Sequence, residues 1–304
     1  MKIVYLTHVN VHGIRAHVHN TLKTVEALQR AGGQVTLLSM DVPPTTQAWT
    51  EIVQRHSLVT EFQRFFLGRV TFDRLMQSSR LKRAWSYLQM NFFMSVYLWK
   101  HRSEFDVVYH RFHFFVLPEL LWRFLVRKPV VYESHYVYIQ NRFLQAFTVL
   151  AIRSATCVVA ITDGLKKYYQ LSDERAMVVP CHASEFELVP TATPAELREE
   201  LQLPGEATIL CYTGTIGVTI QGISYEVETM VDVLLALPES SISVIVGAKE
   251  EKDKKALEDR ACALNVVSRV IIRPWSDRAT IMKYLVASDI LMLPRVGTAP
   301  GSSP

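Results

Sequence analysis

The sequence predicts an α/β protein with two domains, each built on a parallel sheet that helices cover on both faces. Strand-like and helical patterns alternate along most of the chain, as is typical of parallel sheets. A second observation is that an apolar strand followed by a glycine-containing loop occurs twice, at 2–13 and again at 209–222. We therefore expect two similar domains facing each other, with a ligand between them at the carboxyl ends of the strands.

Length and composition support two domains. The chain has 304 residues, and single cores seldom serve more than about 250 to 300 residues. Its composition, 49% hydrophobic and 20% charged, is that of a globular protein and argues against disorder. The stretch from Val189 to Pro194 alternates Pro and Thr with small apolar residues and is the best linker candidate. We place the domains at 1–185 and 186–304.

Charge is divided unevenly between these domains. Residues 1–185 carry 22 basic and 13 acidic side chains, and residues 186–304 carry 11 basic and 16 acidic ones. The net charge of +4 therefore combines +9 in the first domain with −5 in the second. A basic first domain favours anionic partners such as lipid headgroups, nucleic acid or phosphorylated substrates.

The cysteines and the apolar runs bear on location. The four cysteines lie far apart, without Cys-x-x-Cys spacing, and are expected to be buried free thiols in a reducing compartment: Cys157, Cys181, Cys211 and Cys262. Only four apolar residues follow Lys2, too few for a signal peptide. No apolar run approaches the roughly 20 residues that span a bilayer. The sequence predicts a cytoplasmic protein.

In the first domain, strands are predicted at Lys2–Thr7, Gln34–Met40, Phe105–His110, Pro129–Glu133, Thr156–Ile161 and Ala176–Val179. The intervening patterns predict helices at Arg15–Ala31, His113–Val126, Asn141–Arg153 and Asp163–Gln170. The first helix has apolar residues at helical spacing and ends before Gly32 and Gly33. Thr162 is placed to cap the last of these helices.

The stretch Trp49–Arg102 is helical in pattern and combines aromatic with basic residues. Its rings include Phe62, Phe65, Phe66, Trp85, Phe92, Phe93, Tyr97 and Trp99. One interpretation is a membrane-surface element, with rings at the headgroup boundary and Arg80, Lys82 and Arg83 on anionic lipid. The favoured interpretation is that the rings form core and the arginines a solvated face.

Two places in the first domain carry candidate site residues. Gly13 stands at the entrance to a strand, helix, strand unit, where it is either a plain turn glycine or part of a loop that presents N–H groups to phosphate. Glu133 and His135 follow a strand at its carboxyl end, where ligand-binding residues gather in parallel sheets. They form either a structural hydrogen-bonded pair or a functional one.

In the second domain, strands are predicted at Ala207–Thr213, Ser241–Ala248, Arg269–Arg273 and Ile290–Leu293. Helices are predicted at Ser224–Leu237, Glu251–Leu264 and Arg278–Ala287. Before them, Thr193, Pro194 and Glu196 have the spacing of a helix start with a capping box. Residues 297–304 form a loop where a helix would be expected, so the second domain is expected to be incomplete.

Several segments in order resemble the retaining GT-B glycosyltransferases of the large group that includes bacterial mannosyltransferases and glycogen synthase. Residues 14–18 with 31–35 resemble the family's first helix and turn, and residues 105–110 with 130–135 its central strands. The segment 155–168 is similar to the one before the domain crossover. In the second domain, the matching pieces are 212–214 with 221–222, 287–294 and 301–304.

The resemblance implies transfer of a sugar from a nucleotide diphosphate to a hydroxyl acceptor, with the anomeric configuration kept. His135 would contact the transferred sugar or the reacting centre. Substrate binding would involve Gly13, Arg15, Glu133, Gly214, Thr215, Gln221, Gly301, Ser302 and Ser303. No metal ligand set and no cofactor are predicted. The implied partners are a nucleotide-sugar donor and a glycan or lipid-linked acceptor, with peripheral membrane contact a further hypothesis.

Departures from the family pattern keep two alternatives open. Gln221 stands where the family commonly has Lys, and Gly301 stands at the first position of the family's glutamate pair. These departures motivate a non-catalytic sugar-nucleotide binder, which would bind donor without hydrolysis or transfer. A sugar-nucleotide epimerase would instead release an altered free sugar without an acceptor. Nucleic acid is not a predicted partner, because no recognition module is present.

Overall fold

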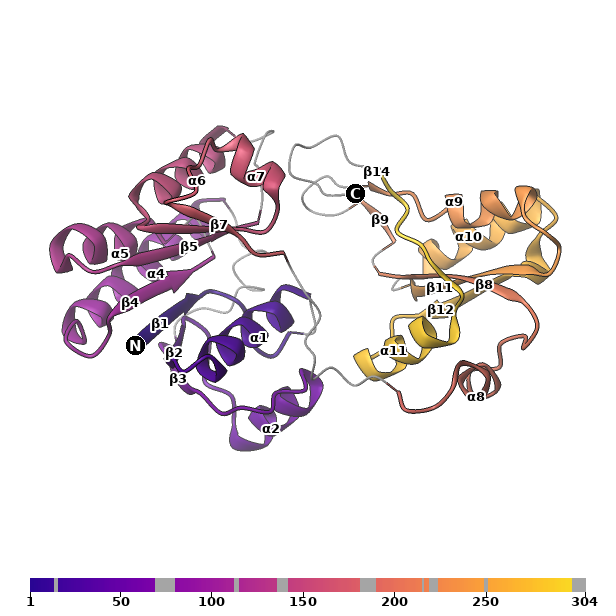
Figure 1. Ribbon diagram of the computed structural model, residues 1–304, viewed down its shortest axis with the longest axis horizontal. Helices are drawn as coiled ribbons and strands as arrows, with labels where there is room; N and C mark the ends of the chain where they lie inside the picture. Colours follow the sequence, from indigo (N-terminus) through magenta and orange to yellow (C-terminus); the bar gives the residue numbers. More distant parts are fainter. Residues whose placement is uncertain are drawn as a thin grey trace. The chain divides into compact units, whose positions relative to one another are not determined.

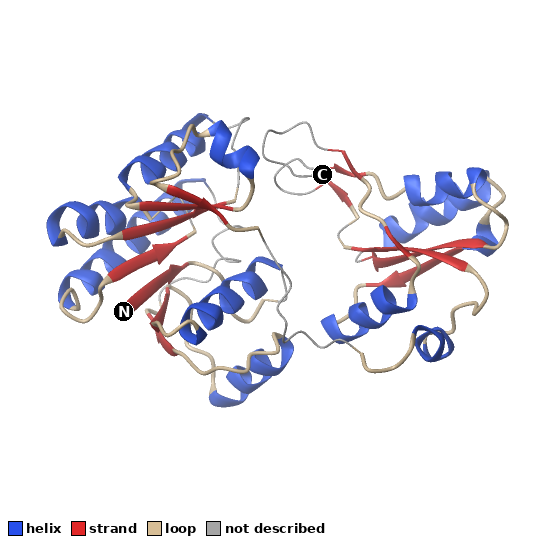
Figure 2. Ribbon diagram, viewed as in Figure 1, coloured by secondary structure: helices blue, strands red, loops and turns tan. Residues whose placement is uncertain are grey.

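The computed structural model describes residues 1–13, 16–68, 80–111, 115–135, 142–180, 190–214, 216–218, 224–248 and 251–296. The chain forms two compact units, whose main bodies are Met1–Phe186 and Glu187–Thr298. Each unit has its own parallel sheet with helices packed against it (Figure 2). The α/β architecture with two parallel sheets is therefore as the sequence predicts.

The first unit contains a seven-stranded sheet in the order β3-β2-β1-β4-β5-β6-β7, with every neighbouring pair parallel (Figure 1). Its strands are β1 (Lys2–Thr7), β2 (Gln34–Ser39), β3 (Gln63–Phe66), β4 (Val107–His110), β5 (Val130–Ser134), β6 (Cys157–Ala160) and β7 (Ala176–Val178). Because all strands run the same way, their carboxyl ends share one edge of the sheet.

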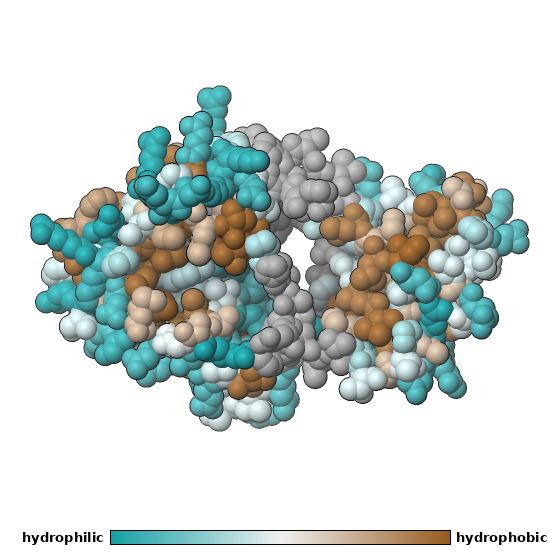
Figure 3. Space-filling model, viewed as in Figure 1, coloured by the Kyte–Doolittle hydropathy of each residue, from teal (hydrophilic) through white to brown (hydrophobic). Residues whose placement is uncertain are grey.

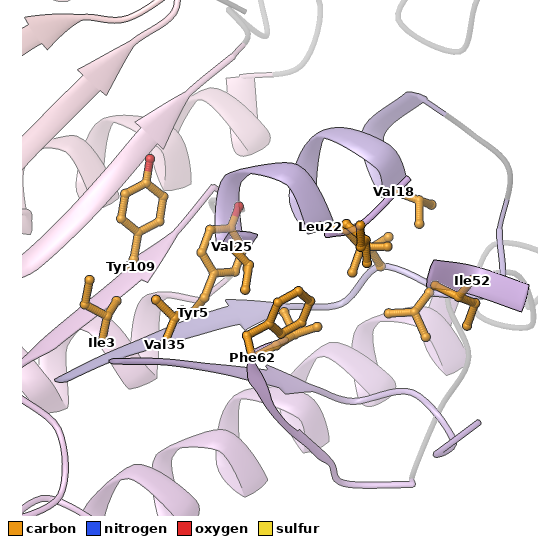
Figure 4. Packing of buried hydrophobic residues seen from close by; sticks show 13 residues of the cluster. Ile3, Tyr5, Val18, Leu22, Val25, Val35, Ile52, Phe62 and Tyr109 are labelled. Atoms are coloured by element: carbon orange, nitrogen blue, oxygen red, sulfur yellow. The ribbon is translucent and has the colours of Figure 1, made fainter. Parts of the chain in front are cut away.

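Helices cover both faces of this sheet. They are α1 (Ala16–Arg30), α2 (Thr46–Arg55), α4 (Arg80–Lys100), α5 (Val116–Leu120) with the π-helix η1 (Leu121–Val126), α6 (Arg142–Ser154) and α7 (Asp163–Tyr168). On one face, side chains of α1 and α2 pack on alternate residues of β1, β2 and β4, including Ile3, Tyr5 and Tyr109 (Figure 4). On the other face, α4, α5 and η1 cover Val4, Leu6 and their neighbours. This alternation follows the two-residue period of a strand.

The second unit contains a four-stranded parallel sheet in the order β12-β11-β8-β13 and a small antiparallel sheet in the order β14-β10-β9. Its strands are β8 (Thr208–Thr213), β9 (Gly217–Val218), β10 (Ser224–Tyr225), β11 (Ser241–Ala248), β12 (Val270–Pro274), β13 (Ile290–Leu291) and β14 (Arg295–Val296). Its helices are α8 (Pro194–Glu200), α9 (Thr229–Asp232), η2 (Val233–Ala236), α10 (Glu251–Ala263), η3 (Val267–Arg269) and α11 (Arg278–Ala287).

Two apolar clusters lie on the two faces of the four-stranded sheet. Leu210, Tyr212 and Ile245 face α9, η2 and α10. Ile209, Cys211 and neighbouring residues instead face α8 and α11. Both predicted caps are present: the Thr162 hydroxyl accepts the Leu165 N–H at the start of α7, and Thr193 and Glu196 form a capping box at α8.

Three expectations were wrong. Within Trp49–Arg102, Gln63–Phe66 is a strand, because it pairs in parallel with β2. The predicted helix Ser224–Leu237 begins as the strand Ser224–Tyr225, which pairs with β9 and β14. Cys262 is exposed rather than buried, since it lies on the outer side of α10.

Candidate functional site

The carboxyl edge of the first sheet begins with two stacked tyrosines. Tyr5 of β1 and Tyr109 of β4 are paired across neighbouring strands, and their ring centroids lie 5.1 Å apart. Figure 4 shows the two rings side by side, each ending in its hydroxyl oxygen. Both side chains are buried, and burial raises the pKa of each phenol well above its ordinary value. Both tyrosines are therefore neutral hydrogen-bonding groups.

A carboxylate and an imidazole complete this edge. The Tyr109 hydroxyl donates to Oε2 of Glu133, at 2.8 Å. Oε1 of the same carboxylate lies 2.5 Å from Nε2 of His135, which directly follows β5. The Glu133 and His135 side chains are only 9% and 6% exposed. The structure thus places these two predicted residues in one buried hydrogen-bonded unit.

The charge states of the pair follow from burial and neighbours. Burial by itself raises the pKa of the Glu133 carboxyl, but the hydrogen bond from His135, the Arg111 guanidinium and the Tyr109 hydroxyl outweigh it and lower that pKa. Burial lowers the pKa of His135, and Arg111 lowers it further, against the opposing effect of Glu133. Glu133 is therefore ionised and His135 neutral near pH 7.

These charge states select one tautomer of His135. A neutral imidazole carries one N–H, and the contact with a carboxylate requires that this N–H be on Nε2. Nδ1 is then an acceptor. The ring can accept a hydrogen bond from a hydroxyl group and can take up a proton, while Glu133 holds its orientation.

Arg111 supplies the positive charge of the site. It follows β4 as His135 follows β5, and its guanidinium acts electrostatically on Tyr5, Glu133 and His135. A cation that favours ionised Glu133 and opposes protonated His135 maintains the charge states described above. Such a group would also attract an anionic ligand to this edge.

The loop after β1 is held by hydrogen bonds within the first unit. Buried Asp41, just after β2, accepts the Val11 N–H through Oδ2. Asn10 accepts the His12 N–H through its side chain and the Gly13 N–H through its carbonyl, and Arg55 donates to the His12 carbonyl. A Cβ on Gly13 would lie 3.0 Å from the Asn10 carbonyl oxygen. The close packing of this loop therefore explains why position 13 is a glycine. Its approach to phosphate stays a prediction.

At the carboxyl edge of the second sheet, two glycines touch. Gly214 follows β8, and Gly247 lies near the end of β11 with φ +142°. A Cβ on Gly247 would lie 1.8 Å from the Gly214 carbonyl oxygen, and one on Gly214 would lie 2.7 Å from the Tyr212 hydroxyl. The absence of side chains here lets the two backbones approach each other at the edge of the sheet where such folds bind ligands, with Gly247 buried and Gly214 half-buried.

The remaining predicted site residues lie outside the described part of the chain: Arg15, Thr215, Gln221, Gly301, Ser302 and Ser303. Sequence reasoning missed Tyr5, Tyr109, Arg111 and Gly247. Two of them had a usable signal, since Arg111 follows a predicted strand and Gly247 is a glycine at the end of one. The tyrosines gave none, because an aromatic residue inside an apolar strand is ordinary core.

Two further features of the described residues bear on the site. They contain no group of three or more His, Cys, Asp or Glu side chains arranged to hold a metal ion. None of the helices between residues 1 and 296 that the structure describes is long and apolar enough to span a membrane.

Solved structures match nearly the whole chain. HepE from Anabaena, in complex with UDP and glucose, aligns with a TM-score of 0.65 at 15% identity, over 99% of this chain and 76% of HepE. Sucrose-phosphate synthase from Thermosynechococcus elongatus aligns with a TM-score of 0.67 at 14% identity, over 97% of this chain and 75% of the synthase. The chain therefore has the GT-B fold, which nucleotide-sugar glycosyltransferases share.

The same fold carries epimerases. UDP-GlcNAc 2-epimerase from Neisseria meningitidis, bound to UDP-GlcNAc, aligns with a TM-score of 0.55 at 12% identity, over 96% of this chain and 77% of the epimerase. No protein-family model and no curated protein matches the sequence. The comparisons define the fold, and the choice of reaction depends on the site.

Proposed function

We propose that this protein is a retaining glycosyltransferase that moves a sugar from a nucleoside diphosphate to a hydroxyl group, in the synthesis of a glycan, polysaccharide or glycolipid. The observation that carries the proposal is the buried, ionised Glu133 holding a neutral His135 at the carboxyl edge of a GT-B sheet. Strand carboxyl ends are where such folds bind ligands, and perturbed ionisable groups gather at functional sites.

The reaction exchanges one bond for another at the anomeric carbon. The bond to the diphosphate oxygen breaks, a bond to the acceptor oxygen forms, and the acceptor's proton leaves with the diphosphate. Catalysis of such a step comes from orienting the reactants and stabilising the leaving charge. In this proposal the His135 ring contacts the transferred sugar, and Arg111 adds positive potential.

The two units have separate roles in this proposal. Residues 1–185 supply His135 and receive the acceptor, and residues 186–304 bind the nucleotide. Half-buried Gly214 at the end of β8 supports the second role, because backbone without a side chain can approach a phosphate group closely. Structures of one similar protein, HepE, contain UDP or UDP-glucose, so a UDP-sugar is the first donor to test.

The test is hydrolysis or transfer of UDP-glucose by the full chain, followed by proton NMR of the released or transferred sugar before mutarotation. Retained α configuration is expected, since the donor is an α-glycoside. His135→Ala should lower the rate more than tenfold with an unchanged circular dichroism spectrum. Unchanged turnover in His135→Ala would remove the proposed role of this residue, and inverted product would remove the retaining mechanism.

Epimerisation is the second candidate, favoured by the epimerase structures that share the fold. The same assay with UDP-GlcNAc distinguishes it. Release of an altered free sugar, or of an altered nucleotide sugar, without an acceptor would favour an epimerase. Binding of UDP by calorimetry without any turnover would favour a non-catalytic binder.

A further inference from the structure

Helix α4 has two apolar faces, of which the first unit uses one. Met90, Met94 and Leu98 are buried in the core beneath the helix. On the opposite side, Trp85, Leu88, Phe92 and Trp99 are 62%, 58%, 59% and 46% exposed. With about 100° of turn per residue, these four side chains fall within about 60° of one another. They form an apolar ridge that points away from the core.

This arrangement reverses the usual pattern of a surface helix. The outward face of such a helix is ordinarily polar, because exposed apolar surface is costly in water. Isolated exposed apolar residues are common, but four large ones in register along one face mark an interaction surface. The ridge runs from residue 85 to residue 99, a length of about 21 Å at 1.5 Å per residue.

The neighbouring element extends the apolar surface. The π-helix η1 packs against α4 and buries Trp122 beneath it. Its outward residues Phe124 and Leu125 are exposed. Figure 3 shows hydrophobic side chains reaching the visible surface of the first unit among hydrophilic ones. The apolar surface therefore involves two packed elements, and we call it the α4 ridge after its four principal residues.

Cations flank the α4 ridge. Exposed Lys82 and Lys100 lie about 90° from its centre on the same flank, one near each end of the helix. The Arg102 guanidinium lies over the Trp99 ring, 4.7 Å from its centroid. No Asp or Glu occurs in α4, and Glu104, which follows the helix, is hydrogen-bonded to His101. The surface that covers the ridge must therefore combine an apolar region with negative charge.

An anionic lipid surface has both properties. Apolar and aromatic side chains enter the headgroup boundary of a bilayer, and lysines at the flanks of such a helix bind lipid phosphates. The tryptophans at both ends of the ridge suit this boundary, since the indole has an apolar body and a polar N–H. A helix lying in the interface plane needs no spanning segment.

We propose that the α4 ridge docks the first unit onto an anionic membrane surface. Trp85, Leu88, Phe92 and Trp99 enter the headgroup boundary, while Lys82, Lys100 and Arg102 contact lipid phosphates. This proposal does not depend on the proposed sugar transfer, because it rests on a face of the unit that carries none of the candidate site residues.

The test is co-sedimentation of the full chain with vesicles of phosphatidylcholine alone or with about one third phosphatidylglycerol. The wild-type chain should bind the anionic vesicles and should bind neutral ones at least tenfold more weakly, since each lysine near an anionic surface contributes about 1 kcal/mol. The double variant Trp85→Ser and Phe92→Ser should lose at least tenfold in binding, because two large apolar side chains no longer leave water. Leu235→Ser, at an equally exposed apolar residue of η2, is the matched control and should change nothing.

A charge variant tests the other half of the proposal. Lys82→Glu with Lys100→Glu should weaken binding at least tenfold and reduce its sensitivity to salt, whereas Lys255→Glu in α10 should not. The proposal would be overturned if the wild-type chain did not bind anionic vesicles. It would also be overturned if the Trp85 and Phe92 changes left the binding unchanged. Dimerisation in sedimentation equilibrium that these two changes abolish, without vesicle binding, would assign the ridge to a second copy of the chain and also overturn it.

Discussion

At the carboxyl edge of the first sheet lies a group of buried, hydrogen-bonded ionisable side chains, whereas two glycines occupy the corresponding edge of the second sheet. Glu133 is buried and hydrogen-bonded to both Tyr109 and His135, so its geometry is fixed. Gly214 and Gly247 instead bring backbone atoms together. In the proposed function, this difference corresponds to a first unit that acts on the reacting groups through side chains and a second unit that contacts the nucleotide through backbone.

Substitutions at the two sheet edges should therefore affect different properties of the protein. In the first unit, a substitution that keeps the shape but alters a charge should affect turnover and pH dependence more than folding. In the second unit, adding a single methyl group should affect folding first. The following variants test this contrast, beginning with the largest expected effect.

Gly247→Ala should destabilise the second unit by about 3 kcal/mol or more, because positive-φ strain and overpacking each cost about 1 to 3 kcal/mol. The new Cβ would lie 1.8 Å from a backbone oxygen that cannot easily move, at φ +142°. Hydrogen–deuterium exchange should show faster exchange in β8 and β11 and unchanged exchange in β1 and β4.

Two further alanine variants calibrate this result. Gly214→Ala should cost less, because its new Cβ meets the hydroxyl end of the Tyr212 side chain, which can shift. Gly205→Ala should be nearly neutral, since nothing lies within 4 Å of the added Cβ. Equal stability of all three variants would contradict the close approach of the two strands.

Glu133→Gln should lower the rate of UDP-glucose turnover roughly tenfold to a hundredfold, which corresponds to about 1.4 to 2.7 kcal/mol in the barrier. The amide keeps the shape but loses the charge that favours protonated His135. The pKa of His135 should therefore fall further, and an NMR titration of the ring should show this. The exposed residue Glu206 offers a control, since Glu206→Gln should alter neither quantity.

The pH dependence of stability has a definite sign. The folded chain holds both Glu133 and His135 at pKa values below their ordinary values of 4.5 and 6.5. As the pH falls through these values, the unfolded chain takes up protons first, so the wild type loses stability progressively below about pH 6.5. Glu133→Gln has no carboxyl to titrate at this position, so its free energy of unfolding should not show the part of the decrease that Glu133 causes below about pH 4.5. Denaturant titrations of both proteins at several pH values measure this difference.

Among the changes at the first sheet's edge, Tyr109→Phe should have the smallest effect on turnover and should cost about 1.5 kcal/mol of stability, because it removes one hydrogen bond to a charged group. The ring that stacks on Tyr5 is kept. Turnover should fall only a few-fold, since His135 still contacts the carboxylate. A loss of turnover as large as that of His135→Ala would mean that the Tyr109 hydroxyl itself takes part in the reaction.

The sequence by itself determined the order of the major strands and helices. Strong apolar runs such as Lys2–Thr7 and Ser241–Ala248 have the bounds that their periodicity predicts. The caps at Thr162 and Thr193 were predictable because capping depends on residues within one turn. The position of Glu133 and His135 at the carboxyl edge of the sheet was predictable, because the carboxyl ends of parallel strands share one edge.

Tertiary structure alone decided three features that depend on distant partners. Phe65 lies in a strand because it pairs with Leu38 of β2, although its own stretch has a helical pattern. The Tyr5 and Tyr109 pair joins residues more than 100 positions apart, and Gly247 meets Gly214 only when β11 and β8 pair. The α4 ridge has the same cause: helical periodicity shows that Trp85 and Phe92 share a face, but only the packing of Met94 and Leu98 against the core shows that this face points outward.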